Sequence, residues 1–160
     1  MSDFNIVIEG GPRTMRTFQE LAKRVKDLNP VWTKFLVFYK KTVIPGAFNT
    51  KGKIMGKAWA PYSESYAKTL ASKGLTTDVT LERSKKLRKA AQGGAGWFQI
   101  LQKLDLEFGV KDIKYSRVHQ MGYKNIPQRP YFVTVKEDLP KRAWAFLLKE
   151  TNAYIEAADK

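Results

Sequence analysis

"WFQILQKLDLEFGV", residues 97–110, is the stretch that decides the fold class. Apolar and polar residues alternate on both sides of Lys103, and this two-residue period is typical of half-buried strands. The simplest interpretation is a two-stranded hairpin that turns near Lys103. Because the segments around it have helical periods, we expect an α+β fold. Its small, mostly antiparallel sheet packs against N-terminal and C-terminal helices.

The helical segments are indicated by apolar residues at steps of three and four. The clearest examples are the stretch from Met15 to Leu28 and the stretch after Pro140, where proline occupies the first turn. We expect helices over residues 13–28, 31–43, 62–74, 80–91, 115–121 and 137–159. Strand-forming residues at 4–8 and 129–135 predict two further strands for the same sheet.

Residues 45–61 have a different composition, with several glycines, a proline at each end and a weak apolar pattern. These features favour a long, mobile, basic loop. Such loops are uncommon inside compact domains and are often functional, so we expect an arm that carries Lys51, Lys53, Lys57 and Trp59. The rest of the 160 residues forms a single domain with it, since the length is near that of one domain.

Composition excludes several classes of chemistry. The chain has no cysteine, so disulfides and thiolate sites cannot form, and its one histidine cannot build a His-rich metal site. The apolar run Phe4–Ile8 is too short for a signal peptide, and we expect no membrane-spanning segment and a protein that is soluble.

His119 is the natural candidate for catalysis, and the sequence gives it little support. The chain around it holds no acid, there is no Gly-x-Ser-x-Gly elbow, and "GGPR" and "GGAG" lack the spacing of phosphate-binding loops. We therefore expect no enzyme activity, no cofactor and no metal. A histidine on a short helix, hydrogen-bonded to nearby backbone, is the simpler interpretation.

The charge balance predicts a polyanionic partner. Lysine and arginine number 29 against 15 acids, for a formal charge of +14. Residues 28–63 and 113–136 hold no acid at all. These runs are either solvated faces or contact surfaces for DNA or an acidic protein, and the sequence leaves both open. Non-specific DNA binding is accordingly one candidate function, although no sequence-reading motif accompanies it.

"IPQRP", residues 126–130, places Arg129 between two prolines. Proline fixes its own φ and biases the preceding residue toward extended backbone, so the guanidinium projects from a stiff segment. A stiff arginine suits a two-pronged contact to a carboxylate or to backbone carbonyls. It is either a clamp inside the subunit or a contact to a neighbouring subunit.

Several ordered motifs together resemble a known family. Its members show Trp-x-Pro-Leu-Ser followed by Tyr and Lys, then Leu-x-x-Ser/Thr-Gly-x-Leu, Tyr-Ala-x-x-His-Gln-x-Gly and Ile-Pro-x-Arg-Pro-Phe. The matching residues here are Trp59, Pro61, Ser63, Tyr66, Lys68, Leu81, Ser84, Leu87, Tyr115, His119, Gln120, Gly122, Ile126, Pro127, Arg129, Pro130 and Tyr131. On these residues the chain resembles the phage virion morphogenesis family, the tail-completion proteins of Mu-like and related long-tailed phages. Lys85 stands where that family often has glycine, which favours a helix over 80–91.

The resemblance implies a structural virion protein rather than an enzyme. It implies a tail terminator at the head-proximal end of the tail, a hexameric ring that performs head-tail joining at the neck during virion assembly. The partners would be further copies of the chain, neck or connector proteins and tail tube or sheath proteins, with contact to packaged DNA as a further expectation. Assembly would take place in the host cytoplasm. The residues expected at these interfaces are Lys51, Lys53, Lys57, Trp59, His119, Gln120 and Arg129.

Overall fold

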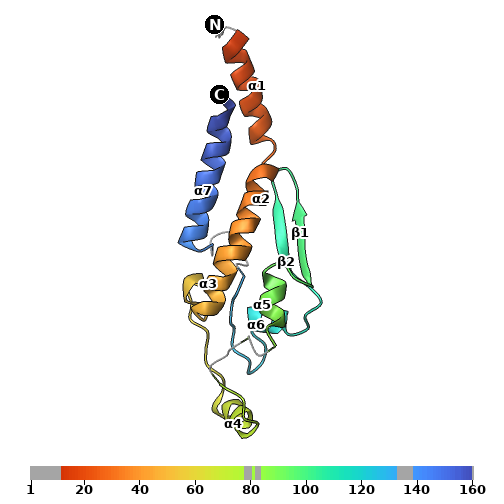
Figure 1. Cartoon of the computed structure of the whole chain (residues 1–160), viewed down its shortest axis with the longest axis vertical. Coiled ribbons are helices and arrows are strands. Elements are labelled where there is room, and N and C mark those ends of the chain that lie inside the picture. Colours follow the sequence, from red (N-terminus) through yellow and green to blue (C-terminus); the bar gives the residue numbers. More distant parts are fainter. Residues whose placement is uncertain (1–11, 78–80, 82–83, 133–138, 160) are drawn as a thin grey trace, which may run out of the picture.

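The computed structural model describes residues 12–77, 81, 84–132 and 139–159, and it confirms the α+β class. The molecule is elongated: in the view of Figure 1, α2 lies between α7 and the hairpin, with α1 at one end and α4 at the other. The helices are α1 (Pro12–Val25), α2 (Asn29–Phe38), α3 (Ile44–Asn49), α4 (Glu64–Ser72), α5 (Lys86–Ala91), α6 (Ser116–Met121) and α7 (Lys141–Glu156). The strands are β1 (Trp97–Leu101) and β2 (Leu106–Val110).

The hairpin has the predicted form. β1 and β2 are antiparallel, with Trp97 opposite Val110 and Leu101 opposite Leu106. A 2.9 Å hydrogen bond from the Gln102 N–H to the Asp105 carbonyl closes the turn around Lys103. This two-stranded ribbon is stable because it packs on a helix: Phe108 meets Tyr39 edge-on at 4.8 Å between ring centroids. The Lys103 carbonyl also accepts a 2.7 Å bond from the Leu28 N–H, which ties the turn to the junction of α1 and α2.

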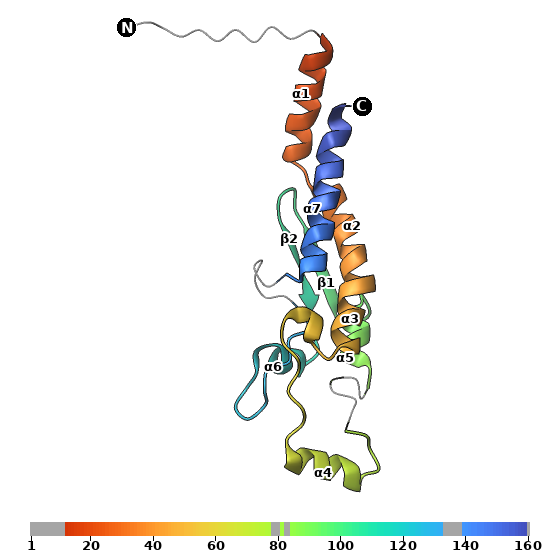
Figure 2. The ribbon, with the colours of Figure 1, turned by 90° about the vertical axis from the view of Figure 1, so that its left-hand side faces the viewer.

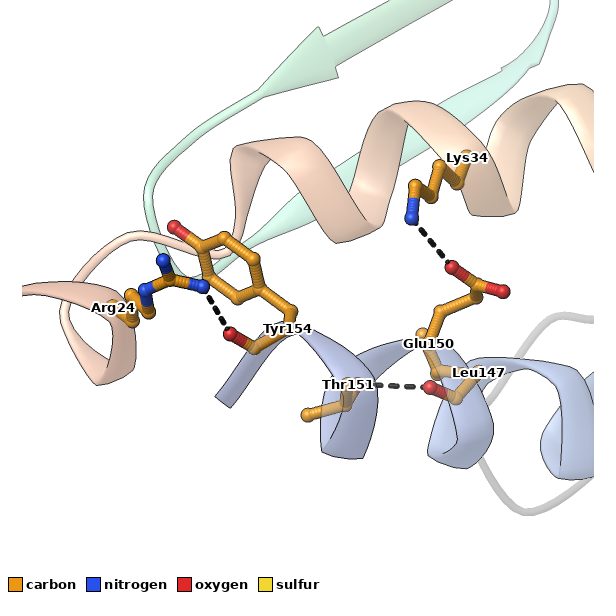
Figure 3. A network of polar contacts seen from close by, with 6 residues as sticks. All are labelled: Arg24, Lys34, Leu147, Glu150, Thr151 and Tyr154. Atoms are coloured by element: carbon orange, nitrogen blue, oxygen red, sulfur yellow. Dashed lines mark hydrogen bonds and ion pairs between the residues drawn. The ribbon is translucent and has the colours of Figure 1, made fainter. Parts of the chain in front are cut away.

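α2 and α7 form the second layer. They run antiparallel and face each other, with Phe38 and Phe146 stacked at 4.1 Å between centroids. Figure 3 shows polar contacts of α7 with the two N-terminal helices: Lys34 of α2 pairs with Glu150 at 2.8 Å, and Arg24 of α1 donates a 2.6 Å bond to the Tyr154 carbonyl. The predicted helices at 13–28 and 137–159 are confirmed as α1 and α7, although α7 begins only at Lys141 and residues 137–138 lie outside the described residues.

The helix predicted over 31–43 continues further than expected. A π-helical turn, Tyr39–Val43, joins α2 to α3, so the chain stays helical from Asn29 to Asn49. Pro45 lies in the first turn of α3. There its missing N–H costs little, and the wider π turn before it relieves the clash of its ring with the preceding backbone.

The loop predicted over residues 45–61 is therefore wrong for residues 45–49, which belong to α3. The remaining residues, 50–61, form a tight turn and a return stretch instead of a long loop. Ala47 and Phe48 of α3 are buried. The chain then turns back through a 3-10 turn, Lys53–Met55, and the Trp59 N–H donates a 2.7 Å bond to the Lys51 carbonyl. Glycine and proline indicated a loop by composition, but here they serve as a helix start and as the ends of a tight turn.

The element that does project is α4. The predicted helix is confirmed and is followed by Gly74 at φ 65°. Figures 1 and 2 show α4 beyond the end of the body, and residues 58–63 lead to it without helix or strand. We call residues 62–77, which contain α4, the arm.

The helix predicted over 80–91 is wrong at residues 81, 84 and 85, while residues 80, 82 and 83 lie outside the described residues. α5 begins only at Lys86, and Leu81 and Lys85 have left-handed backbones with φ of 65° and 54°. Lys85 adopts the conformation that glycine takes most readily, so the turn is kept without the glycine. Burial of Leu81 and Leu87, at 8% and 0% exposed, pulls the chain into this shape against its local propensity.

The remaining strand predictions fall partly outside the described residues. Residues 4–8 and 133–135 lie there entirely. Tyr131 and Phe132, which were expected to begin a strand, do not pair with β1 or β2. Their rings join the core formed by α2, α5 and the hairpin.

Candidate functional site

Trp59 lies in the core and not on an extended loop. Its side chain is 7% exposed and meets Phe48 edge-on at 5.3 Å between centroids. Its indole Nε1 donates a 2.7 Å hydrogen bond to the carbonyl of Pro130. A buried indole N–H needs such an acceptor. The bond therefore fixes the segment that leads to the arm against "IPQRP".

Arg129 makes the neighbouring contacts. Its Nε donates to the Ala60 carbonyl at 2.9 Å and its Nη2 donates to the Pro61 carbonyl at 2.8 Å. The guanidinium also lies 5.4 Å from the ring centroid of Tyr62, and the residue is only 2% exposed. These are the contacts of an internal clamp, made by two of the three guanidinium nitrogens.

The charge of Arg129 has no acidic partner among the residues that the structure describes. Burial lowers the pKa of its guanidinium, and Tyr62 acts in the opposite direction. Arginine titrates so far above neutrality that the group stays cationic all the same. A buried cation without a carboxylate nearby is costly, since carbonyl dipoles and one ring replace only part of its hydration.

Gln120 holds the segment after "IPQRP". Its Oε1 accepts bonds from the N–H groups of Tyr131 and Phe132, both at 3.1 Å, and its Nε2 donates to the Phe132 carbonyl at 2.7 Å. One side-chain amide thus replaces a neighbouring strand. The N–H groups of Tyr131 and Phe132 thus have an acceptor although neither residue belongs to the sheet.

His119 precedes Gln120 on α6, whose end is marked by Gly122 at φ 75°. Its carbonyl accepts a 2.7 Å bond from the Arg129 N–H. The ring nitrogen Nδ1 is buried and has no hydrogen-bond partner in the described part of the chain. The sequence led us to expect a bond between the imidazole and nearby backbone, and Nδ1 does not make one there. Burial, and then the Arg129 charge, lower the pKa of His119. The ring is therefore neutral near pH 7.

We call this set of contacts, made by Trp59, His119, Gln120 and Arg129, the joint. The structure brings together these four of the seven residues predicted from the sequence. The other three, Lys51, Lys53 and Lys57, are exposed on the turn before Trp59 and take no part in it. The joint fastens the base of the arm to α6 and to "IPQRP".

A groove of about 820 Å³ opens beside the joint, between the base of the arm and α6. Tyr62 and Tyr66 line one side, with rings 5.1 Å apart, while Tyr115 and Ile126 come from the body. Tyr66 and Ile126 are 44% and 40% exposed. Sequence reasoning found these residues only as parts of motifs. They form one surface only because the joint holds the base of the arm against α6, and no local sequence pattern predicts that.

Other kinds of site find no support in the described residues. None of the groupings of histidine, aspartate and glutamate there is suited to hold a metal ion. Each helix described is too short or too polar to cross a bilayer. Comparisons of the chain with models of protein families, with curated proteins and with solved structures found no match.

Proposed function

We propose that the chain is a structural virion protein, a tail-completion subunit that forms a ring at the head-proximal end of a phage tail and joins the tail to the neck. The observation that carries the proposal is the joint. Three of the residues that resemble the tail-completion family bind backbone carbonyls and N–H groups through their side chains: Trp59, Gln120 and Arg129. They build the base of a projecting helix.

A ring subunit needs such a design. Each copy must keep one shape while a projecting element reaches the next copy, and the contacts must close under rotation. The arm extends past the body (Figure 2), and Tyr66 of the arm is 44% exposed and open to a neighbour. The net charge of +14 suits docking on acidic neck, tube or sheath proteins, or on packaged DNA in the lumen. A hexamer assembled in the host cytoplasm is the form that we propose.

Electron microscopy of the purified full-length protein tests this function. Closed rings of uniform diameter, together with a hexamer mass in light scattering, are the expected result. A chain that stays monomeric at every concentration, or that forms only open filaments, would contradict it.

Non-specific DNA binding is the second candidate, and the exposed lysines at 51, 53 and 57 favour it. Binding of this kind depends on counterion release, so affinity for random duplex should fall steeply as salt rises. We expect the replacement of these three lysines by glutamine to reduce the slope of that dependence. Tight binding by the monomer that is lost between low and moderate salt would favour this candidate over the ring.

A further inference from the structure

The groove beside the joint combines aromatic walls with one positively charged side chain. Its walls carry the rings of Tyr62, Tyr66 and Tyr115, and Arg129 is its buried cation. Two guanidinium nitrogens of Arg129 donate to carbonyls. The third, Nη1, has no hydrogen-bond partner within the described residues. An apolar groove with one unneutralised cation fits an apolar side chain beside a carboxylate.

A polypeptide fits this groove better than a nucleic acid does. Arg129 is 2% exposed, so only a slender group reaches it, whereas a phosphate is flanked on both sides by sugars. Among the lining residues that the structure describes there is no lysine, and a bound strand would need several phosphate contacts. A single carboxylate next to an apolar side chain satisfies both features.

The chain itself offers such a pair at the turn of the hairpin. Leu104 is 56% exposed and the adjacent Asp105 is exposed too. Glu107, also exposed, follows two residues later, so β2 and the turn before it carry two carboxylates beside the single lysine of the turn, Lys103. On β1, Ile100 lies opposite Glu107 and is 48% exposed, which continues the same acid and apolar pairing.

We propose that the groove of one copy of the chain receives the Leu104–Asp105 turn of a second copy. This inference rests on the proposed function and names the two surfaces that would join the ring. The turn is bonded to the junction of α1 and α2, while α4 and α6 lie toward the other end of the molecule (Figure 1). Contact between two different surfaces is head-to-tail, which closes into rings when the rotation allows.

Disulfide trapping tests the contact directly, because the chain has no cysteine of its own. Leu104→Cys and Asn125→Cys are made as separate single variants, since Asn125 is an exposed residue of the groove. Mixed and oxidised, they should give a crosslinked dimer that neither variant forms alone. Val37→Cys replaces Asn125→Cys as the matched control, because Val37 is 45% exposed on α2 and lies away from the groove. Equal crosslinking with the control would overturn the proposal.

Asp105→Asn gives a second measurement in the uncrosslinked protein. We expect it to weaken self-association at least about tenfold, since it removes the charge that faces Arg129. Glu156→Gln, a change at an exposed acid on α7, should leave self-association unchanged. Rings that persist in Asp105→Asn without specific crosslinking would overturn this contact and leave the proposed function standing. A chain that never assembles would overturn both. Protection of Asn125→Cys from thiol labelling by a random DNA duplex, without any effect of Asp105→Asn, would also overturn it.

Discussion

Trp59 and Pro130 are joined by a 2.7 Å hydrogen bond across 71 positions of sequence. The bond links two segments that precede and follow the hairpin, so it fixes where the arm leaves the body. Arg129, the residue before Pro130, makes a second connection between the same two segments through the carbonyls of Ala60 and Pro61, which follow Trp59. The base of the arm is thus held by side-chain bonds to backbone groups, which allow little sliding.

The first prediction concerns the turn that places Trp59. Gly52 has φ 84°, and a methyl group there would overlap the indole ring and lie 2.6 Å from the Lys57 carbonyl oxygen. We expect Gly52→Ala to lower the free energy of unfolding by about 2–4 kcal/mol, from backbone strain and overpacking together. Urea denaturation measures the loss.

Gly56 is the matched control for that variant. Its φ is 86°, but nothing lies within 4 Å of an added methyl group. Gly56→Ala should therefore cost only the backbone strain, about 1 kcal/mol. Equal losses in the two variants would contradict the packing of Gly52 against Trp59.

These glycines also show how far the sequence could be interpreted. The hairpin and the helices α1 and α7 were predictable, since their periods are long and regular. The region of Gly52 and Gly56 was not, because glycine marks a flexible loop and a tight left-handed turn equally well. The contact between Gly52 and Trp59 shows that the segment is a tight turn and not a flexible loop. Trp59 is close to both glycines in sequence, but its position depends on its contacts with Phe48 and Pro130.

The joint was predictable in its members and not in its roles. Trp59, His119, Gln120 and Arg129 stand out by motif, yet nothing local says that Arg129 meets Ala60 or that Gln120 replaces a strand. Those contacts span long stretches of chain and depend on the tertiary fold. Lys85 shows the same limit. Its left-handed backbone follows from the burial of Leu81 and Leu87 and opposes the conformational preference of lysine.

The second prediction concerns Gln120. Gln120→Ala removes three hydrogen bonds and leaves the N–H groups of Tyr131 and Phe132 without their acceptor. We expect the free energy of unfolding to fall by about 2–4 kcal/mol, because an unmet buried polar group costs more than a hydrogen bond gains. Gln128→Ala, at an exposed position, should change it by less than about 0.5 kcal/mol. A loss in Gln120→Ala no larger than in Gln128→Ala would contradict the strand-like role of the amide.

The third prediction separates the shape of Arg129 from its charge. Lysine keeps the charge but cannot reproduce the two parallel bonds to Ala60 and Pro61. Arg129→Lys should therefore destabilise the isolated monomer by about 1–3 kcal/mol. Arg117→Lys, at an exposed residue of α6, is the control and should have almost no effect. Normal stability of the monomer in Arg129→Lys would argue against the internal clamp.

The fourth prediction follows from the lowered pKa of His119. Above its ordinary pKa of 6.5 the imidazole is neutral in both the folded and the unfolded chain, so it adds no pH dependence. As the pH falls below 6.5, the unfolded chain takes up the proton first, because burial and the Arg129 charge oppose protonation in the folded one. Stability must then decrease until the pH has passed the folded pKa as well.

His119→Gln removes this proton from the balance, and because the chain has one histidine, the variant has none. The carboxylates titrate in both proteins and cancel in the difference between them. Urea denaturation of wild type and variant between pH 7.5 and 5 should show the wild type losing more stability than the variant as the pH falls. A difference between the two proteins that stays constant over this range, or that moves in favour of the wild type at low pH, would contradict the burial of a neutral ring beside Arg129.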